Sequence, residues 1–310
     1  MKIALIIISI LLIIVLIISY IVYKIAFCNN DKSKDGTYSV LTGEQYDKYK
    51  ETFIKIIDDV IDEKYEEVYI KSYDGKTLYG RYFHRNDNRE VQILFHGYRG
   101  NAYKDMSGGV KLALEYGSNV LLIDQRSHGK SDGKTISFGI KERYDVVSWV
   151  AYINKKFNYN VPIIISGISM GAATVLMASN LNLPQNVAGI IADCPFSSPK
   201  TILINVAKQL KIPSFIAYPL LVIAAFVYGL FNLNEASAIK SVKESNIPIL
   251  LIHGDDDRLV PYTMSKDIYN ANSKNIKLVI FKNAAHGISY IIDENLYRKE
   301  SKEFIEKVLK

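Results

Sequence analysis

The most informative stretch of this 310-residue chain is Ser166-Gly167-Ile168-Ser169-Met170-Gly171. It follows the apolar run Val161–Ile165 and opens a second apolar run, Ala172–Leu181, which predicts a helix. A sharp turn from a strand into a helix needs small residues on each side of the serine, and it raises the serine hydroxyl above the sheet. The bare Gly-x-Ser-x-Gly pattern also fits a glycine-rich turn with a serine helix cap, so its position between a strand and a helix carries the prediction.

The segments around this turn predict an α/β fold. Short apolar runs alternate with helical stretches, and the runs are continuous, as expected for strands that helices cover on both faces. This pattern predicts a mostly parallel, doubly wound sheet with its site at the C-terminal ends of the strands. Before it, Glu67–Tyr73 and Lys76–His84 alternate around Asp74-Gly75, which predicts a β-hairpin. The other predicted strands are Val91–Phe95, Asn119–Ile123, Ala188–Ala192, Ile247–Ile252 and Ile276–Phe281.

A serine hydroxyl at such a turn becomes a nucleophile only when a base removes its proton. The expected chain order is serine, acid, histidine, with each partner at the end of a later strand. The histidines of the chain are His84, His96, His128, His253 and His286. Only the last two follow Ser169, and no strand that carries an acid lies between Ser169 and His253. His286 follows the last predicted strand through a short loop, so it is the predicted base.

The predicted acid lies after the preceding strand, where Asp255, Asp256 and Asp257 form a triplet. Asp257 is deepest in the loop and comes just before the next helix, so we choose it over the other two. An isolated acidic triplet is commonly a solvated turn. This triplet lies where the base needs its acid, which favours the catalytic interpretation.

The loop after the first parallel strand contains His96-Gly97-Tyr98-Arg99-Gly100-Asn101. Its glycines allow the backbone to approach a substrate closely. We predict an oxyanion hole that pairs the backbone N–H of Met170, directly after the nucleophile, with the N–H of Tyr98 in this loop. His96 is expected to order the loop through hydrogen bonds rather than to act as a base.

Five motifs, in this order along the chain, carry a resemblance to the α/β-hydrolase superfamily. The similarity runs from about Glu67 to the C-terminus. Within the superfamily the chain most resembles bacterial, often membrane-anchored hydrolases of the serine aminopeptidase-like and monoacylglycerol-lipase-like group. The resemblance implies the α/β-hydrolase fold and a serine triad, and it says little about the substrate. The motifs are HGYRGN at 96–101, DQRSHGKSDG at 124–133, GISMGA at 167–172, HGDDDRLVP at 253–261 and AAHG at 284–287.

The resemblance also implies roles for single residues. The last aspartate of the HG-x-x-D motif is the triad acid in this group, which supports Asp257. The stretch at 124–133 is structural there, so Asp124, Arg126 and His128 are expected to form a loop network. Arg99-Gly100-Asn101 departs from the aromatic and small residues that usually follow the HG turn in monoacylglycerol lipases. This departure argues against lipase activity proper.

The N-terminal segment Ile3–Tyr23 contains 21 residues without a charge, flanked by Lys2 and Lys24. A helix of that length spans roughly 31 Å, the thickness of a bilayer core. Its exit has no small-residue cleavage pattern, so we predict an uncleaved, single-pass anchor over residues 1–27 that contacts membrane lipid through residues 3–23. The two residues before the helix favour a catalytic domain outside the cytoplasm, whereas the lysines after the helix favour a cytoplasmic one. We expect the catalytic domain on the extracytoplasmic side.

Two further segments complete the predicted organisation. Residues 28–65 are expected to form a polar linker, Asn29–Gly43, and an amphipathic helix whose apolar face is Tyr46, Tyr49, Phe53, Ile56 and Val60. Residues 66–310 form the hydrolase domain, with a helical cap insertion at about 196–243. Ile212–Asn234 within it has no charge. A second membrane span there would put the predicted acid and base across the bilayer from the serine, so we expect an apolar roof over the site.

The composition excludes some functions. The net charge is +6, but the lysines are scattered and no basic run occurs, which argues against nucleic-acid binding and fits an anionic lipid surface. Cys28 and Cys194 are expected to be free thiols, and no cysteine or histidine spacing predicts a metal site. The predicted mechanism needs no metal or organic cofactor.

Three functions remain open on the sequence alone. The first is a serine hydrolase that cleaves carboxylic esters of a small, apolar or lipid-like substrate. The second keeps the triad and cleaves amides, as the aminopeptidase-like relatives do. The third is a non-catalytic binding module, because a fold alone does not prove activity. The intact triad and loop argue against the third function, and we take the first as the prediction.

Overall fold

The computed structural model describes residues 1–29 and 40–310. Most of the predicted linker therefore lies outside the described residues, together with Lys32 and Lys34. The helices are α1 (Lys2–Ala26), α2 (Lys50–Ile61), α3 (Ala102–Glu115), α4 (Glu142–Lys156), α5 (Met170–Ala178), α6 (Pro199–Gln209), α7 (Ser214–Ile223), α8 (Ala238–Glu244), α9 (Thr263–Ala271), α10 (Ser289–Ile292) and α11 (Glu294–Val308). A 3₁₀ turn, η1 (Asp47–Tyr49), precedes α2, and a π-helical segment, η2 (Ala224–Tyr228), continues α7.

Eight strands form the central sheet in the order β1-β2-β4-β3-β5-β6-β7-β8. β1 and β2 form the predicted antiparallel hairpin, β2 pairs antiparallel with β4, and the other pairs are parallel. The mostly parallel, doubly wound sheet is thus confirmed. The strands are β1 (Glu66–Lys71), β2 (Thr77–Phe83), β3 (Val91–Phe95), β4 (Asn119–Asp124), β5 (Ile163–Ile168), β6 (Val187–Asp193), β7 (Ile249–Gly254) and β8 (Ile276–Phe281).

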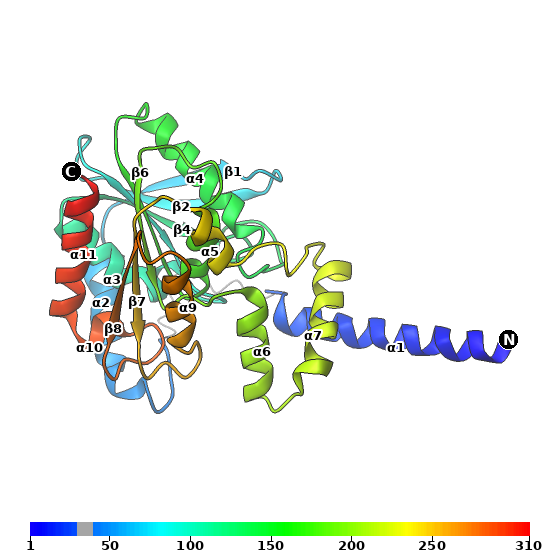
Figure 1. Cartoon of the computed structure of the whole chain (residues 1–310). Helices are drawn as coiled ribbons and strands as arrows, with labels where there is room; N and C mark the ends of the chain where they lie inside the picture. The colour runs from blue at the N-terminus through cyan, green and yellow to red at the C-terminus, as the bar shows by residue number, and fades with distance from the viewer. Residues whose placement is uncertain (30–39) are drawn as a thin grey trace.

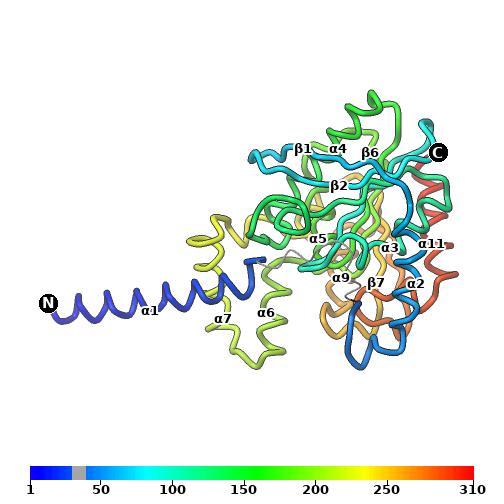
Figure 2. The backbone as a smooth tube through the Cα atoms, turned by 180° about the vertical axis from the view of Figure 1, so that it is seen from behind, coloured from blue at the N-terminus to red at the C-terminus, as the bar shows by residue number. Residues whose placement is uncertain are grey.

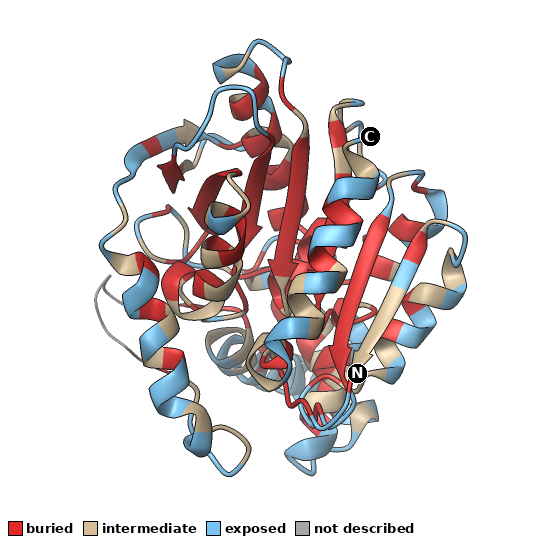
Figure 3. Cartoon of the chain, turned by 90° about the vertical axis from the view of Figure 1, so that its left-hand side faces the viewer, coloured by how far each residue is buried: buried red, intermediate tan, exposed pale blue. Residues whose placement is uncertain are grey.

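Helices cover both faces of this sheet, as the continuous apolar runs predicted. On one face α4, α5, α8 and α9 pack around a cluster that contains Trp149, Val175 and Ile268. On the other face, α3 contributes Val110 and α11 contributes Phe304 to two further clusters. Figure 3 shows the buried strands between helices whose outer faces are exposed. The sheet is therefore a rigid platform that fixes the loops at its strand ends.

The N-terminal helix lies outside this layered body. Figure 1 and Figure 2 show α1 extending away from the sheet, with the inserted helices α6 and α7 beside its C-terminal end. Among the described residues, α1 is the one helix long and apolar enough to cross a membrane, a property that signal sequences share. The inserted segment between β6 and β7 consists of α6, α7, η2 and α8.

The predicted amphipathic helix and the predicted free thiols are both found. The turn η1 begins this helix and α2 forms the rest of it. The buried residues of α2 are Phe53, Ile57 and Val60, and α3 packs against α2. Cys28 and Cys194 are both buried, and neither forms a disulfide. Burial rather than cross-linking accounts for both cysteines.

Candidate active site

The predicted nucleophile lies at a strained turn between β5 and α5. Ser169 has φ 53° and ψ −116°, a backbone conformation that a non-glycine residue adopts only at a cost. The turn is tight enough to require its glycines. A Cβ on Gly167 would lie 2.4 Å from the carbonyl carbon of Gly171, and one on Gly171 would lie 2.1 Å from the carbonyl oxygen of Phe95. The Ser169 N–H donates to the carbonyl of Asp193 at 2.8 Å, which ties the turn to β6.

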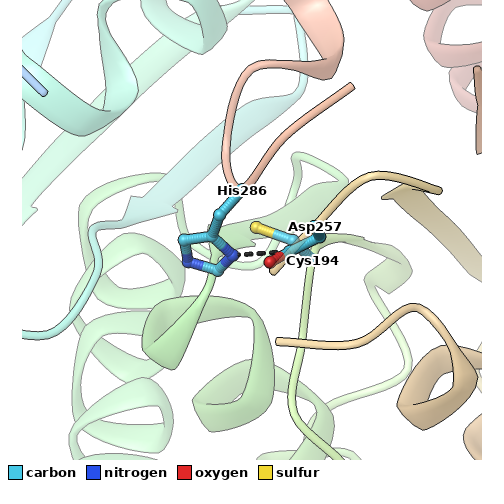
Figure 4. Close-up of side chains that lie close together, drawn as sticks. All are labelled: Cys194, Asp257 and His286. Atoms are coloured by element: carbon cyan, nitrogen blue, oxygen red, sulfur yellow. Dashed lines mark hydrogen bonds and ion pairs between the residues drawn. The ribbon is translucent and has the colours of Figure 1, made fainter. Parts of the chain in front are cut away.

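Three residues predicted from the sequence meet above the strand ends. The Oγ of Ser169 lies 2.8 Å from Nε2 of His286. The Nδ1 of His286 lies 2.7 Å from Oδ2 of Asp257. Figure 4 shows the imidazole of His286 facing this carboxylate. Ser169 is half-buried and the other two are buried, so the hydrogen-bonded relay is largely shielded from bulk water while the hydroxyl stays accessible.

The carboxylate of Asp257 accepts four hydrogen bonds. Its Oδ1 accepts from the backbone N–H groups of Leu259 and Val260, at 2.9 and 2.7 Å. Its Oδ2 accepts from His286 and from Nε2 of His253, the latter at 3.1 Å. Burial by itself raises the pKa of this carboxyl, but the His286 charge and the hydrogen bonds from both histidines outweigh burial and lower the pKa to about 2. The group is therefore ionised at neutral pH.

His253 is a site residue that the sequence did not reveal. Its Nε2 also lies 2.8 Å from the carbonyl of Val260, and its Nδ1 lies 2.7 Å from the hydroxyl of Ser265. Because the Val260 carbonyl can only accept, Nε2 carries the proton and donates to both oxygens. His253 thus fixes Asp257 from the side opposite His286. Its position four residues before Asp257 at a strand end was the available signal.

The two predicted oxyanion donors flank the serine. Met170 is the first residue of α5, so its N–H is among the helix N–H groups that have no intrahelical partner. Tyr98 lies in the loop after β3, next to Gly97, where an added Cβ would approach the Cβ of Ser169 to 3.5 Å. The Gly97 N–H donates to the half-buried carboxylate of Asp105 at 2.9 Å, which holds the loop in place. The two segments that carry the predicted donors therefore meet at the serine turn.

The predicted loop network at 124–133 is confirmed. The buried guanidinium of Arg126 donates two hydrogen bonds to Asp145, both at 2.6 Å. His96 accepts from the N–H of Gln125 at 3.0 Å, and burial lowers the pKa of His96 to about 4, so it is neutral and orders its loop. His128 accepts from the N–H of Arg99 at 3.1 Å. These residues support the loop after β3, whereas the serine hydroxyl is hydrogen-bonded to His286.

Cys194 lies close to the acid and the base. Its sulfur and the nearest ligand atoms of Asp257 and His286 lie within 4.8 Å of one another. Figure 4 shows the three side chains gathered together. The geometry alone would allow a metal ligand set. Burial and the nearby carboxylates raise the pKa of the Cys194 thiol well above its ordinary value, so the thiolate that metals bind is disfavoured. All four acceptor positions of Asp257 are also taken by N–H donors, so the donor set does not fit a metal.

The end of α1 contacts the oxyanion loop directly. The hydroxyl of Tyr98 donates to the carbonyl of Ala26 at 2.9 Å. The guanidinium of Arg99 donates to the carbonyls of Ile25 and Cys28, at 2.6 and 2.8 Å. The carbonyls of Ile25 and Ala26 belong to the last turn of the helix and that of Cys28 to the second residue after it, where a cation is favoured. No local sequence pattern predicts this contact, since 74 positions separate Ile25 from Arg99.

The segment before α2 contacts the opposite side of the site. Gln45 donates from Nε2 to the carbonyl of Asp256 at 2.9 Å, in the loop that carries the acid. Tyr46 packs against a cluster that contains Ala285, next to His286. Burial together with the charge of Asp257 raises the pKa of Tyr46 to about 12. Both loops that carry the acid and the base are therefore covered by the N-terminal segment.

One apolar cluster continues from the nucleophile to the inserted helices. It contains Met170, Phe138 and Phe196 beside the turn, Leu221 of α7, and Phe27 at the end of α1. The rings of Tyr98 and Phe138 lie against each other with centroids 5.0 Å apart, and the rings of Phe138 and Phe196 have centroids 6.2 Å apart. The surroundings of the serine on this side are apolar rather than charged.

The sheet, the strained serine turn and the inserted helices define an α/β-hydrolase. The family model described as serine aminopeptidase, S33, matches residues 86–225 and 222–290, which together cover most of the body. The chain therefore belongs to the serine aminopeptidase S33 family of hydrolases.

Individual relatives agree with this assignment. The uncharacterized protein YqkD of Bacillus subtilis (strain 168) is 31% identical over 243 residues, which cover 77% of this chain and 78% of YqkD. The lysophosphatidylserine lipase ABHD12 of Xenopus tropicalis is 27% identical over 171 residues, 52% of this chain and 40% of that lipase. The Pyrococcus furiosus esterase Pf2001 has a TM-score of 0.65 and 23% identity over 80% of this chain and 94% of that chain, a likeness of fold.

Proposed function

We propose that this chain is a membrane-anchored serine hydrolase that cleaves carboxylic esters of apolar, lipid-like substrates. The observation that carries the proposal is the continuous relay from Ser169 through His286 to Asp257, with contacts of 2.8 and 2.7 Å. A hydroxyl in this position is activated by the imidazole, and the carboxylate keeps the imidazole in the required tautomer.

The proposed reaction follows from these positions. Nε2 of His286 takes the proton of Ser169 while Oγ attacks the acyl carbon, and the N–H groups of Met170 and Tyr98 stabilise the oxyanion. The alcohol leaves with the proton from His286, which forms the acyl-enzyme. Water then attacks the acyl-enzyme with His286 as the base, and the acid product leaves.

The apolar cluster beside the serine supports an apolar acyl or alcohol group in the substrate. Phe138, Phe196 and Tyr98 provide ring faces, and the inserted helix α7 extends the same cluster away from the sheet. Pockets for apolar ligands are lined in this way. The name of the ABHD12 relative, lysophosphatidylserine lipase, agrees with an ester of a lipid.

We further propose that α1 is an uncleaved anchor. The helix has 25 residues, and an 18-residue window of it has a mean hydropathy of 3.4, enough to cross a bilayer. Cleavage near Ala26 would remove carbonyls that accept hydrogen bonds from Tyr98 and Arg99 of the oxyanion loop. This contact supports a helix that stays attached.

Amide hydrolysis is the second candidate, and the aminopeptidase description of the family favours it. A peptide substrate with a free amino terminus needs an anionic group near the acyl pocket. The apolar lining beside Ser169 on the cap side favours the ester instead.

A substrate series separates these possibilities. The full-length protein in detergent is assayed with p-nitrophenyl esters of increasing acyl length and with aminoacyl p-nitroanilides, and Ser169→Ala is the control. We expect turnover of the esters, a preference for longer chains, and no turnover by the variant. Hydrolysis of the anilides alone would favour the aminopeptidase, and no turnover of either class would refute the hydrolase proposal.

A further inference from the structure

The inserted helix α7 and the π-helical segment η2 expose a row of large apolar side chains. Phe215 is 78% exposed and Phe226 is 68% exposed, and both lie on the side away from the buried residues Ala217, Leu221 and Ala225. We call this row the cap face. It consists of Phe215, Ile216, Phe226, Val227 and Leu230. A contiguous apolar surface of this kind marks an interaction site rather than a surface left in water.

The cap face lies beside α1. The hydroxyl of Tyr228 donates to the backbone carbonyl of Leu16 at 2.9 Å, and the ring of Tyr228 lies 5.2 Å from that of Tyr20. Ser19 between them is buried. Residues 3–14 of α1 are exposed throughout, so the inserted helices cover only the C-terminal half of α1.

When α1 crosses a membrane, the contact between Tyr228 and Leu16 sets the depth of the Tyr228 hydroxyl in the bilayer. Leu16 precedes Lys24, the first charge after the apolar stretch, by eight residues. At ~1.5 Å per residue, the Tyr228 hydroxyl lies about 12 Å inside the level of Lys24 along the helix. The hydrocarbon core is ~30 Å thick, so this depth falls within one leaflet. A tyrosine hydroxyl there needs a partner, and the Leu16 carbonyl provides it.

The inserted helices are suited to one leaflet and not to a full crossing. Ser214–Tyr228 is a short apolar helix. Its 15 residues would reach only ~22 Å even if upright. Figure 1 and Figure 2 show α7 running across the line of α1 rather than along it. The helical backbone satisfies its own hydrogen bonds, as burial in lipid requires.

The charges around the cap face agree with a lipid surface. Residues 194–234 contain three lysines and no acidic residue: Lys200, Lys208 and Lys211. The last two are exposed and directly precede the apolar segment. Lysines at the edge of an apolar face attract anionic lipid head groups.

We infer that the cap face inserts into the acyl chains of one leaflet of the same membrane that α1 spans. The inference rests on the proposed anchoring by α1 and adds a second, in-plane membrane contact. It places the apolar cluster between α7 and Ser169 next to that leaflet, so an acyl substrate reaches the site from the lipid phase rather than from water.

Spin labels at single introduced cysteines test this insertion in the full-length chain. The labelled proteins are Phe226→Cys, Phe215→Cys, Ile14→Cys on α1, and Tyr159→Cys, each reconstituted in vesicles of phosphatidylcholine and phosphatidylglycerol. Tyr159 is the matched control because it is 64% exposed but lies after α4, away from α7. The unchanged chain gives the background from its two buried cysteines. The readout is the ratio of collisions with oxygen, which enters lipid, to collisions with a water-soluble nickel chelate.

We expect the ratio at Phe226 and Phe215 to match that at Ile14 and to exceed that at Tyr159 several-fold. Ratios at Phe226 and Phe215 equal to that at Tyr159, with Ile14 in lipid, would overturn the insertion and leave the anchor intact. A water-like ratio at Ile14 as well would overturn both. Turnover of a p-nitrophenyl ester in the same vesicles reports separately on the proposed hydrolase activity.

Discussion

Replacing Asp257 with asparagine changes one atom in the relay and tests how the site holds its proton. In the chain as it stands, Oδ1 of Asp257 faces the N–H groups of Leu259 and Val260, and Oδ2 faces His253 and His286. An amide has one oxygen and one NH₂ group, so one of these two pairs of donors loses its acceptor. Backbone N–H groups cannot move their protons, whereas an imidazole can. The amide oxygen is therefore expected to face the backbone.

The NH₂ group of the variant then faces Nδ1 of His286, which must become an acceptor. The proton of the imidazole moves to Nε2, the atom that lies 2.8 Å from Ser169 Oγ. The base can no longer take the serine proton. A wrong tautomer of this kind lowers kcat/KM by about 10⁴-fold, equivalent to ~5.4 kcal/mol in the transition state.

The same substitution lowers stability. The pKa of Asp257 falls from 3.8 to about 2 in the folded chain, so its charge contributes about 2 kcal/mol to folding at neutral pH. Because the folded pKa is the lower one, this contribution is present above pH 3.8 and is lost as the pH falls through 2. Asp257→Asn removes it at every pH. Urea unfolding of both proteins at neutral and acid pH measures the difference.

The control is Asp256→Asn, because Asp256 is exposed and accepts its hydrogen bond from Gln45. Its kcat/KM on a p-nitrophenyl ester is expected to stay close to that of the unchanged chain. The reasoning fails if Asp257→Asn remains folded and keeps kcat/KM within about tenfold of the unchanged chain, a loss far short of the one that tautomer exchange causes.

Three further substitutions test other parts of the account. Arg99→Ala removes two hydrogen bonds to the end of α1 and is expected to lower kcat about tenfold with KM unchanged. Arg99→Lys is expected to recover part of this loss. A kcat equal to that of the unchanged chain would show that the contact with α1 does not order the loop. Asp145→Ala leaves the buried Arg126 without its bidentate partner, so the free energy of unfolding in urea is expected to fall by ~3–5 kcal/mol. The activity per folded molecule is expected to stay unchanged. A loss of stability under ~1 kcal/mol would contradict this. Gly171→Ala places a Cβ 2.1 Å from the Phe95 carbonyl oxygen and is expected to abolish ester turnover. Gly109→Ala, whose Cβ has its nearest contact at 3.4 Å, is expected to be tolerated. Full turnover by Gly171→Ala would show that the turn relaxes.

Much of the fold was predictable because the strands carry local signals. Val91–Phe95 and Ile276–Phe281 agree residue for residue with β3 and β8. Both consist of large apolar side chains except for Gln92 and Lys277, and polar residues bound them. β5 begins two residues after the predicted Val161 and continues to Ile168, because the sheet extends the strand up to the serine turn. The strand order depends on pairings between distant segments, such as β2 with β4, and no local pattern contains it.

The positions of Ser169, Asp257 and His286 were predictable for a different reason. A parallel sheet brings its C-terminal strand ends to one edge, so chain order and strand ends limit the choices. The supporting contacts were not predictable. His253 on Asp257, Gln45 on Asp256 and Arg99 on the end of α1 join segments through side-chain geometry that forms only after the chain folds.

Labelling with a fluorophosphonate probe tests the central claim most directly. The probe forms a covalent bond only with a serine that a neighbouring base activates, and peptide mass spectrometry locates it. Ser169→Ala removes the proposed nucleophile, and Ser166→Ala is the matched control because Ser166 is buried in the same motif. We predict one label, on Ser169, in the unchanged chain and in Ser166→Ala, and none in Ser169→Ala. A folded protein that stays unlabelled, or equal labelling of Ser169→Ala, would contradict the account.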